Sequence, residues 1–128
     1  MAENMFFKDG RDLKVRQYDV FLADLPSVGA RTHITKGPHY VVVVSNNAAN
    51  RFSEVISVVP LTSKEKKPLP THVVLEGEDV GLPKTSTAMC ELTMPLDKKY
   101  LIKKSGELSG EKRQPLKDAV RIQYSMAE

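Results

Sequence analysis

The stretch Tyr40-Val41-Val42-Val43-Val44 decides the fold class of this chain. Its four consecutive valines are β-branched, which restricts their side chains and favours a strand over a helix. The run is apolar on both faces of such a strand, so we expect a central strand that is covered on both sides. It is also the longest unbroken apolar run in the sequence, far shorter than a membrane-spanning helix requires.

Further strands are expected on either side of this run. Before it, Tyr18, Val20 and Leu22 alternate with other residues and predict a strand from about 16 to 23. After it, apolar stretches bounded by prolines and charged turns predict more strands. These lie at about 54–61, 71–75, 85–91 and 103–107, with a loop at 76–79 and with residues 95–97 leading into a short turn.

The C-terminal stretch changes to a helical period. Its apolar residues fall at i, i+3, i+4 and i+8, namely Leu116, Ala119, Val120 and Tyr124. This predicts an amphipathic helix that ends near Ser125. Its start has two alternatives: Ser109 can cap it, although Pro115 would then interrupt a backbone hydrogen bond, or it begins near Gln114 with Pro115 at the first helical position.

The strand count and the late helix together indicate the fold class. A short helical turn through Arg51 is also expected, capped by Ser45, Asn46 or Asn47. Five or six short strands and one C-terminal helix predict a mainly β (α+β) protein. The architecture is a small, strongly bent sheet or partly open barrel with the helix packed on it.

Length and composition fit one domain. The 128 residues suffice for a core of their own, and the single cysteine, Cys90, excludes an internal disulfide framework. Residues 1–14 show no sustained period and are expected to form a flexible arm before a domain at 15–128. No His and Cys spacing suggests a metal site, and Met5-Phe6-Phe7 is too short for a signal-peptide core. We therefore expect a cytoplasmic protein without a metal or a membrane segment.

The positive charge is concentrated in one segment. The chain carries a formal net charge of +3. Residues 31–67 alone hold six basic and two acidic residues, whereas the rest of the chain is slightly acidic. This segment includes part of a long polar loop at 27–38, and loops of that length are often functional. The pattern is a modest indication of an anionic ligand.

Several blocks, spread from about residue 15 to 125, carry a resemblance to a known family. They are YDVFLADLP at 18–26, VVVVSNNAANRFS at 41–53, VPLTS at 59–63 with LPTHV at 69–73, and GLPK at 81–84 with Cys90-Glu91 and LDK at 96–98. In this order they are similar to the MazF/PemK toxin family. Each block is short, but the collinear set is specific.

The resemblance implies a fold and a function. The fold would be an SH3-like, CcdB-type small β-barrel with a C-terminal helix, working as a homodimer. The function would be that of an mRNA interferase, a metal-independent endoribonuclease toxin that cuts single-stranded RNA at short motifs and is neutralised by a cognate antitoxin. In that family the 2′-hydroxyl attacks its own phosphate and leaves a cyclic phosphate and a 5′-hydroxyl. No cofactor is implied.

The resemblance also selects two catalytic candidates. Thr62 aligns with a family threonine near the scissile phosphate, where its hydroxyl could donate to a phosphoryl oxygen; the alternative is an ordinary turn at a strand end. His39 stands where the family's usual arginine is expected. A histidine can exchange protons near neutral pH and contact phosphate, but it lacks the guanidinium fork. The alternative for His39 is a loop histidine satisfied by the backbone.

Further candidates would bind RNA or support the site. Arg31 could supply the missing guanidinium or be a solvated loop residue, and His33 lies in the same loop. Tyr40 could stack on a base or cover the core. Glu91 aligns with an acidic family position. The other candidates follow Thr62 and are Ser63, Lys64, Lys66 and Lys67, the lysines as phosphate contacts that position RNA without specifying its sequence.

Two other functions stay open. The first is a non-enzymatic CcdB-like toxin that binds gyrase, although such inhibitors use a C-terminal tryptophan and this chain has none. The second is a catalytically weakened RNA-binding homologue. It is suggested by His39, and by Leu92 where the family usually has glutamine. Cys90 and His72 are interpreted as structural residues.

Overall fold

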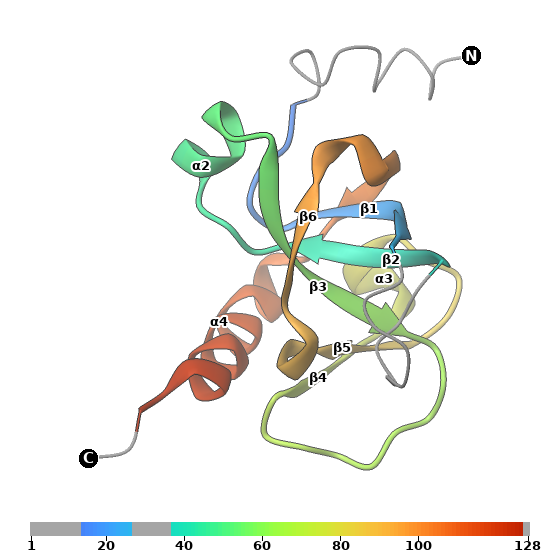
Figure 1. Ribbon diagram of the computed structural model, residues 1–128. Coiled ribbons are helices and arrows are strands. Elements are labelled where there is room, and N and C mark those ends of the chain that lie inside the picture. The colour runs from blue at the N-terminus through green and yellow to red at the C-terminus, as the bar shows by residue number, and fades with distance from the viewer. Residues whose placement is uncertain (1–13, 27–36, 127–128) are drawn as a thin grey trace.

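The structure is a computed structural model that describes residues 14–26 and 37–126 (Figure 1). Most of the expected N-terminal arm lies outside the described residues, as do the loop candidates Arg31 and His33. The described part of the chain folds as an antiparallel sheet with a C-terminal helix. This is the fold class that the sequence predicts.

The sheet has seven strands in the order β4-β5-β3-β2-β1-β7, with β6 paired to β3 off this path. No helix of the described residues is long and apolar enough to cross a membrane. The strands are β1 (Asp19–Leu25), β2 (Gly37–Val43), β3 (Val55–Thr62), β4 (His72–Leu75), β5 (Ser86–Met89), β6 (Met94–Asp97) and β7 (Leu101–Glu107). The helices are α2 (Asn47–Phe52), α3 (Gly77–Val80) and α4 (Gly110–Tyr124), with single 3-10 turns η1 (Cys90–Leu92) and η2 (Lys98–Tyr100).

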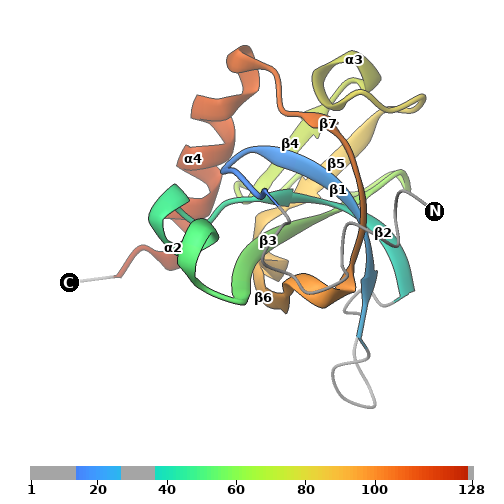
Figure 2. The ribbon, with the colours of Figure 1, turned by 90° about the horizontal axis from the view of Figure 1, so that it is seen from above.

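The valine run lies in the middle of this sheet, between β1 and β3. Val41, Val42 and Val43 are each fully buried, but they belong to two different clusters of core residues. Val42 packs in the cluster that includes Leu116 and Ala119 of α4. Val41 and Val43 pack on the opposite face, in the cluster closed by β6 and β7 (Figure 2). The prediction of a central strand covered on both faces is confirmed.

Two short elements were not predicted. Residues 95–97 were expected only to lead into a short turn, which η2 provides, but they also belong to β6, which pairs along β3 from Val55↔Asp97 to Val58↔Met94. Residues 76–79 were expected to form a loop, yet Gly77–Val80 is helical and ends at Gly81 in the left-handed conformation. Four-residue elements show too little of their period to be recognised, and their stability comes from tertiary burial.

Other boundaries differ by a few residues. The first strand starts at Asp19 because the chain turns at residues 16–19, where Tyr18 has φ +76°. Cys90 was expected in the fifth strand, but it begins η1. The short helix α2 is capped by Asn46, whose side chain accepts a hydrogen bond from the backbone of Ala49 (2.9 Å). Asn46 was one of the three predicted caps.

The helix α4 starts at the earlier of its two alternatives, directly after Ser109, and contains Pro115. Tertiary contacts offset the hydrogen bond that Pro115 cannot make. The backbone N–H of Ser109 donates to the Asp79 carbonyl (2.7 Å) and its hydroxyl donates to the Asp79 carboxylate (2.9 Å). The Arg113 guanidinium donates to the Leu108 carbonyl (3.1 Å) and covers the Tyr18 ring.

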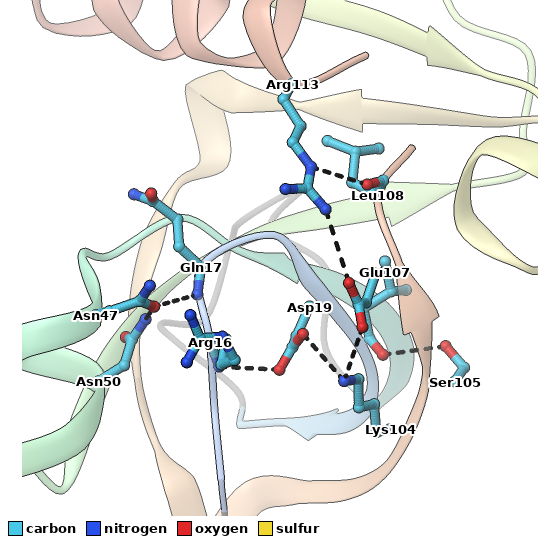
Figure 3. Close-up of polar contacts among 11 residues, drawn as sticks. Arg16, Gln17, Asp19, Asn47, Asn50, Lys104, Ser105, Glu107, Leu108 and Arg113 are labelled. Carbon is cyan, nitrogen blue, oxygen red and sulfur yellow. Dashed lines mark hydrogen bonds and ion pairs between the residues drawn. The ribbon is translucent and has the colours of Figure 1, made fainter. Parts of the chain in front are cut away.

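A chain of charges joins the start of α4 to two strands (Figure 3). The Asp19 carboxylate on β1 is almost fully buried and lies 3.2 Å from the Lys104 ammonium on β7. Glu107 lies between Lys104 (3.5 Å) and Arg113 of α4 (3.7 Å). The more exposed pairs in this chain add little free energy individually, and they connect Arg113 near the start of α4 to β7.

We predict that Leu116→Ala lowers the free energy of unfolding by about 3 kcal/mol, because it leaves a cavity in the core between α4 and the sheet. Leu116 is fully buried. The change is measured by urea unfolding. The neighbouring exposed residue provides the control: Lys117→Ala should shift stability by less than about 0.5 kcal/mol. Equal effects of the two substitutions would show that α4 is not packed as described.

Candidate functional site

A pocket of about 310 Å³ opens where the start of β2 lies near the end of β3. The ladder between these strands runs from Val43↔Val58 to Val41↔Pro60. Carried two residues further, this register would set His39 opposite Thr62. The β2–β3 ladder has ended by that point, while β3 pairs on its other side with β5 through Thr62↔Thr87, and the pocket opens there. Its lining residues are Leu22, Pro38, His39, Tyr40, Leu61, Thr62, Ser63, Lys64, Leu82, Pro83, Lys84 and Ser86.

His39 is held by the first residues of β2. The strand begins at Gly37, whose φ of +81° is a conformation that glycine adopts without strain. His39 pairs with Ala23 of β1, so its backbone belongs to the sheet. Its side chain is partly exposed and lines the pocket. The structure therefore places His39 near the start of a paired strand rather than in a loop.

Thr62 is the last residue of β3 and lies on the same pocket. Its hydroxyl oxygen accepts a hydrogen bond from the backbone N–H of Lys64 (3.2 Å). The strand-end turn considered as an alternative to function is therefore present. The turn occupies the oxygen as an acceptor and leaves the O–H proton able to donate to a ligand. A turn and a ligand contact are thus compatible at Thr62.

The charges around the pocket suit an anion. Of its described lining residues, Lys64 and Lys84 are cationic and none is acidic. Thr62, Ser63 and Ser86 add hydroxyl donors. Cations and hydroxyls around one cavity can stabilise the negative charge of a phosphate, and a histidine beside them can transfer a proton. These are the groups that phosphodiester cleavage needs.

Sequence reasoning missed two of these residues, Lys84 and Ser86. Both lie in or next to the loop between α3 and β5, more than 20 positions after Thr62. Lys84 belongs to the GLPK block that carries part of the family resemblance, and this was the only signal available. Its position beside Thr62 follows from the β3–β5 pairing, which no local pattern encodes.

Glu91 belongs to a second cluster and does not line this pocket. Its carboxylate accepts hydrogen bonds from the Thr71 hydroxyl (3.1 Å) and pairs with His72 Nε2 (2.8 Å). Its backbone carbonyl accepts from Gln123 of α4 (3.4 Å). His72 was interpreted as structural, and the structure agrees: its ring is buried and holds the Glu91 carboxylate in one orientation.

The Glu91 cluster keeps its carboxylate charged. Burial tends to raise the pKa of Glu91, but the hydrogen bonds and charge of His72, with Thr71, outweigh it and hold the pKa below its usual value of 4.5. The neighbouring thiol behaves in the opposite way. Burial, reinforced by the Glu91 charge, raises the pKa of Cys90 to about 12. This agrees with its interpretation as a buried apolar residue rather than a nucleophile.

The remaining candidates divide between the pocket and the surface. Tyr40, Ser63 and Lys64 line the pocket together with His39 and Thr62. Tyr40 also packs against the core cluster, which is the second of its two expected roles, and its stacking on a base stays a prediction. Lys66 and Lys67 are exposed on the connection from β3 to β4 and do not line the pocket. No three His, Cys, Asp or Glu side chains of the described chain gather where they could hold a metal ion.

The chain matches known proteins in both sequence and fold. Residues 16–124 match the profile of a family described as PemK-like, MazF-like toxin of type II toxin–antitoxin system. The chain is 31% identical over 116 residues to the endoribonuclease EndoA of Bacillus subtilis, covering 89% of this chain and 97% of that relative.

Solved structures agree in fold. An endoribonuclease from a mycobacterial species, in complex with its cognate antitoxin, gives a TM-score of 0.72 at 23% identity and covers 89% of this chain and 98% of that one. MazF from Deinococcus radiodurans gives a TM-score of 0.69 at 20% identity, covering 87% of this chain and 96% of that one.

We predict that Glu91→Gln lowers stability at pH 7 by about 1 kcal/mol, because it weakens charge-assisted hydrogen bonds to His72 and Thr71. The folded-state pKa of Glu91 is lowered, so its contribution is complete above its usual value of 4.5 and is lost as pH falls through the folded-state pKa. The difference in the free energy of unfolding between wild type and variant should therefore be smaller at pH 3 than at pH 7. A gap that is constant across this range would contradict the assignment.

Proposed function

The chain belongs to the PemK-like, MazF-like toxins of type II toxin–antitoxin systems, and we propose that it is an endoribonuclease that cleaves single-stranded RNA at short motifs without a metal ion. One observation supports this most: His39 and Thr62 line one pocket, and the described lining of that pocket includes two lysines and no carboxylate. The Bacillus subtilis relative is named as an endoribonuclease, which supports the same reaction class.

The proposed chemistry uses the RNA's own 2′-hydroxyl. His39 takes the proton of that hydroxyl as the 2′-oxygen forms a bond to phosphorus. The bond from phosphorus to the 5′-oxygen breaks, and the leaving oxygen gains a proton from water. The products are a 2′,3′-cyclic phosphate and a 5′-hydroxyl end. Thr62 donates a hydrogen bond to a phosphoryl oxygen, whose negative charge grows in the transition state.

Residues around the pocket would hold the RNA strand. Lys64, Lys66 and Lys67 lie in the exposed connection after Thr62 and would contact phosphates along the backbone. Tyr40 and Ser63 border the same pocket and would contact the nucleotide at the cleavage point. The charged Glu91 carboxylate, held by His72, would accept hydrogen bonds from a base edge.

The proposal extends to the partners of this family. We expect a homodimer in the cytoplasm, silenced by a cognate antitoxin. The mycobacterial endoribonuclease of the same fold was solved with its antitoxin, which supports this expectation. A catalytically weakened RNA binder is the second candidate, because a histidine stands where the family's usual arginine is expected. Family membership makes a gyrase-binding toxin the weaker alternative.

We predict that the purified protein cuts a long single-stranded RNA at defined sites in the presence of EDTA and leaves 5′-hydroxyl ends. The ends are mapped by primer extension and by their reactivity with polynucleotide kinase without prior dephosphorylation. His39→Ala and Thr62→Ala should each lower the rate on the order of a hundredfold, because each removes a group acting on the reacting atoms.

The matched control is Lys117→Ala on the exposed face of α4, which should cleave at the wild-type rate. Binding of RNA without any cleavage by the wild-type protein would favour the weakened homologue. If neither His39→Ala nor Thr62→Ala changes the cleavage rate, the proposed activity remains valid but the assignment of these two residues as catalytic is contradicted.

A further inference from the structure

The histidine at position 39 leaves a question about charge in the pocket. The family pattern expects an arginine at this position, and a histidine lacks its permanently charged guanidinium. Cleavage of a phosphodiester nevertheless builds negative charge on the phosphoryl oxygens. We propose that Lys84 stabilises this charge in the transition state, from the wall of the pocket formed by the loop between α3 and β5. The inference rests on the proposed RNA cleavage.

Lys84 and Lys64 are the two cations among the described lining residues. They come from different segments of the chain. Lys64 lies two residues after Thr62, at the start of a connection whose residues 63–70 are all exposed. Lys84 lies in the loop that leads into β5, the strand paired with Thr62 through Thr87. Lys84 is exposed as well, but it faces the same cavity from a segment that leads directly into a paired strand.

The loop that carries Lys84 is braced against α3. The backbone N–H of Leu82 donates to the Gly77 carbonyl (2.9 Å). The approach is so close that a Cβ at Gly77 would lie 2.2 Å from the Leu82 carbonyl oxygen. On the other side of Lys84, the Thr85 hydroxyl donates to the Glu76 carboxylate (3.0 Å). Contacts to α3 thus flank Lys84 on both sides.

The helix α3 is in turn fixed to the rest of the domain through Asp79. This carboxylate is buried; it accepts from the Glu76 backbone (2.8 Å) and from the Ser109 hydroxyl before α4 (2.9 Å). Gly81, which ends α3, lies close to Ser105 and Gly106 of β7. The backbone under Lys84 is therefore connected to α4 and to the sheet.

This bracing determines what Lys84 can do. A charge whose backbone is already fixed needs little rearrangement when negative charge develops, and such preorganised groups act mainly on the transition state. Lysine is a point charge that does not need the paired geometry of a guanidinium. Lys84 should therefore contribute mainly to kcat, whereas Lys64 on its exposed connection should contribute mainly to RNA binding.

The test compares Lys84→Met, Lys84→Arg and Lys64→Met with wild type on one RNA that has a single cleavage site. We expect Lys84→Met to lower kcat about 100-fold with KM changed less than about threefold. Lys84→Arg should restore most of the loss because it keeps the charge. Lys64→Met should instead raise KM, and Lys117→Met on α4 is the matched charge control.

Several outcomes would overturn the inference. They are an unchanged kcat in Lys84→Met, a loss that appears only in KM, no recovery in Lys84→Arg, or a larger kcat loss in Lys64→Met. The reaction of the wild-type protein shows whether the role of Lys84 or the proposed RNA cleavage itself is wrong. If wild type makes no 5′-hydroxyl ends, RNA cleavage itself is wrong, whereas normal wild-type cleavage with an unimpaired Lys84→Met variant contradicts the role of Lys84 alone.

Discussion

The strand β2 is buried on both of its faces, and this burial sets the positions of its neighbours. In β2, Val42 packs toward α4 while Val41 and Val43 pack toward the opposite core. The strand is therefore held by core packing on both of its faces, and its neighbours β1 and β3 each pair with it in one register. The same register directs the ends of two strands, at His39 and Thr62, toward one pocket. Packing in the core thus determines the geometry of the proposed site.

A second constraint connects the site to the C-terminal helix. The buried Asp79 joins α3 to Ser109, and the residues after Ser109 form α4 despite the proline within it. The loop after α3 forms one wall of the pocket. Asp79 contacts both the residue before α4 and the backbone at the start of α3, which precedes the loop in the pocket wall. A substitution of Asp79 should therefore affect both stability and activity.

The sequence predicts the features that repeat over several residues, and those features are confirmed. The valine run, the alternation before it and the period around Leu116 are long enough to indicate their structures. The short elements α3 and β6 are too brief to show a period. The start of α4 could not be chosen from sequence, since it depends on Asp79, 30 residues earlier in the chain.

The candidate site likewise contains residues that could be predicted from the sequence and residues that could not. Thr62 and His39 could be selected because they occupy positions of a family pattern, and the structure brings both to one pocket. Lys84 could not, because its proximity to Thr62 follows from strand pairing between distant segments. The cluster of His72 with Glu91 likewise joins β4 to η1 through contacts that sequence spacing does not reveal.

The catalytic role of the pocket can be tested by a crystal structure of the protein with an RNA made uncleavable by a 2′-deoxy sugar at the cleavage position. We predict that the scissile phosphate lies in the pocket within hydrogen-bond distance of Thr62 Oγ1, with His39 beside the 2′ carbon. A scissile phosphate bound away from both residues, for example beside Glu91, would contradict the assignment of the pocket as the catalytic site.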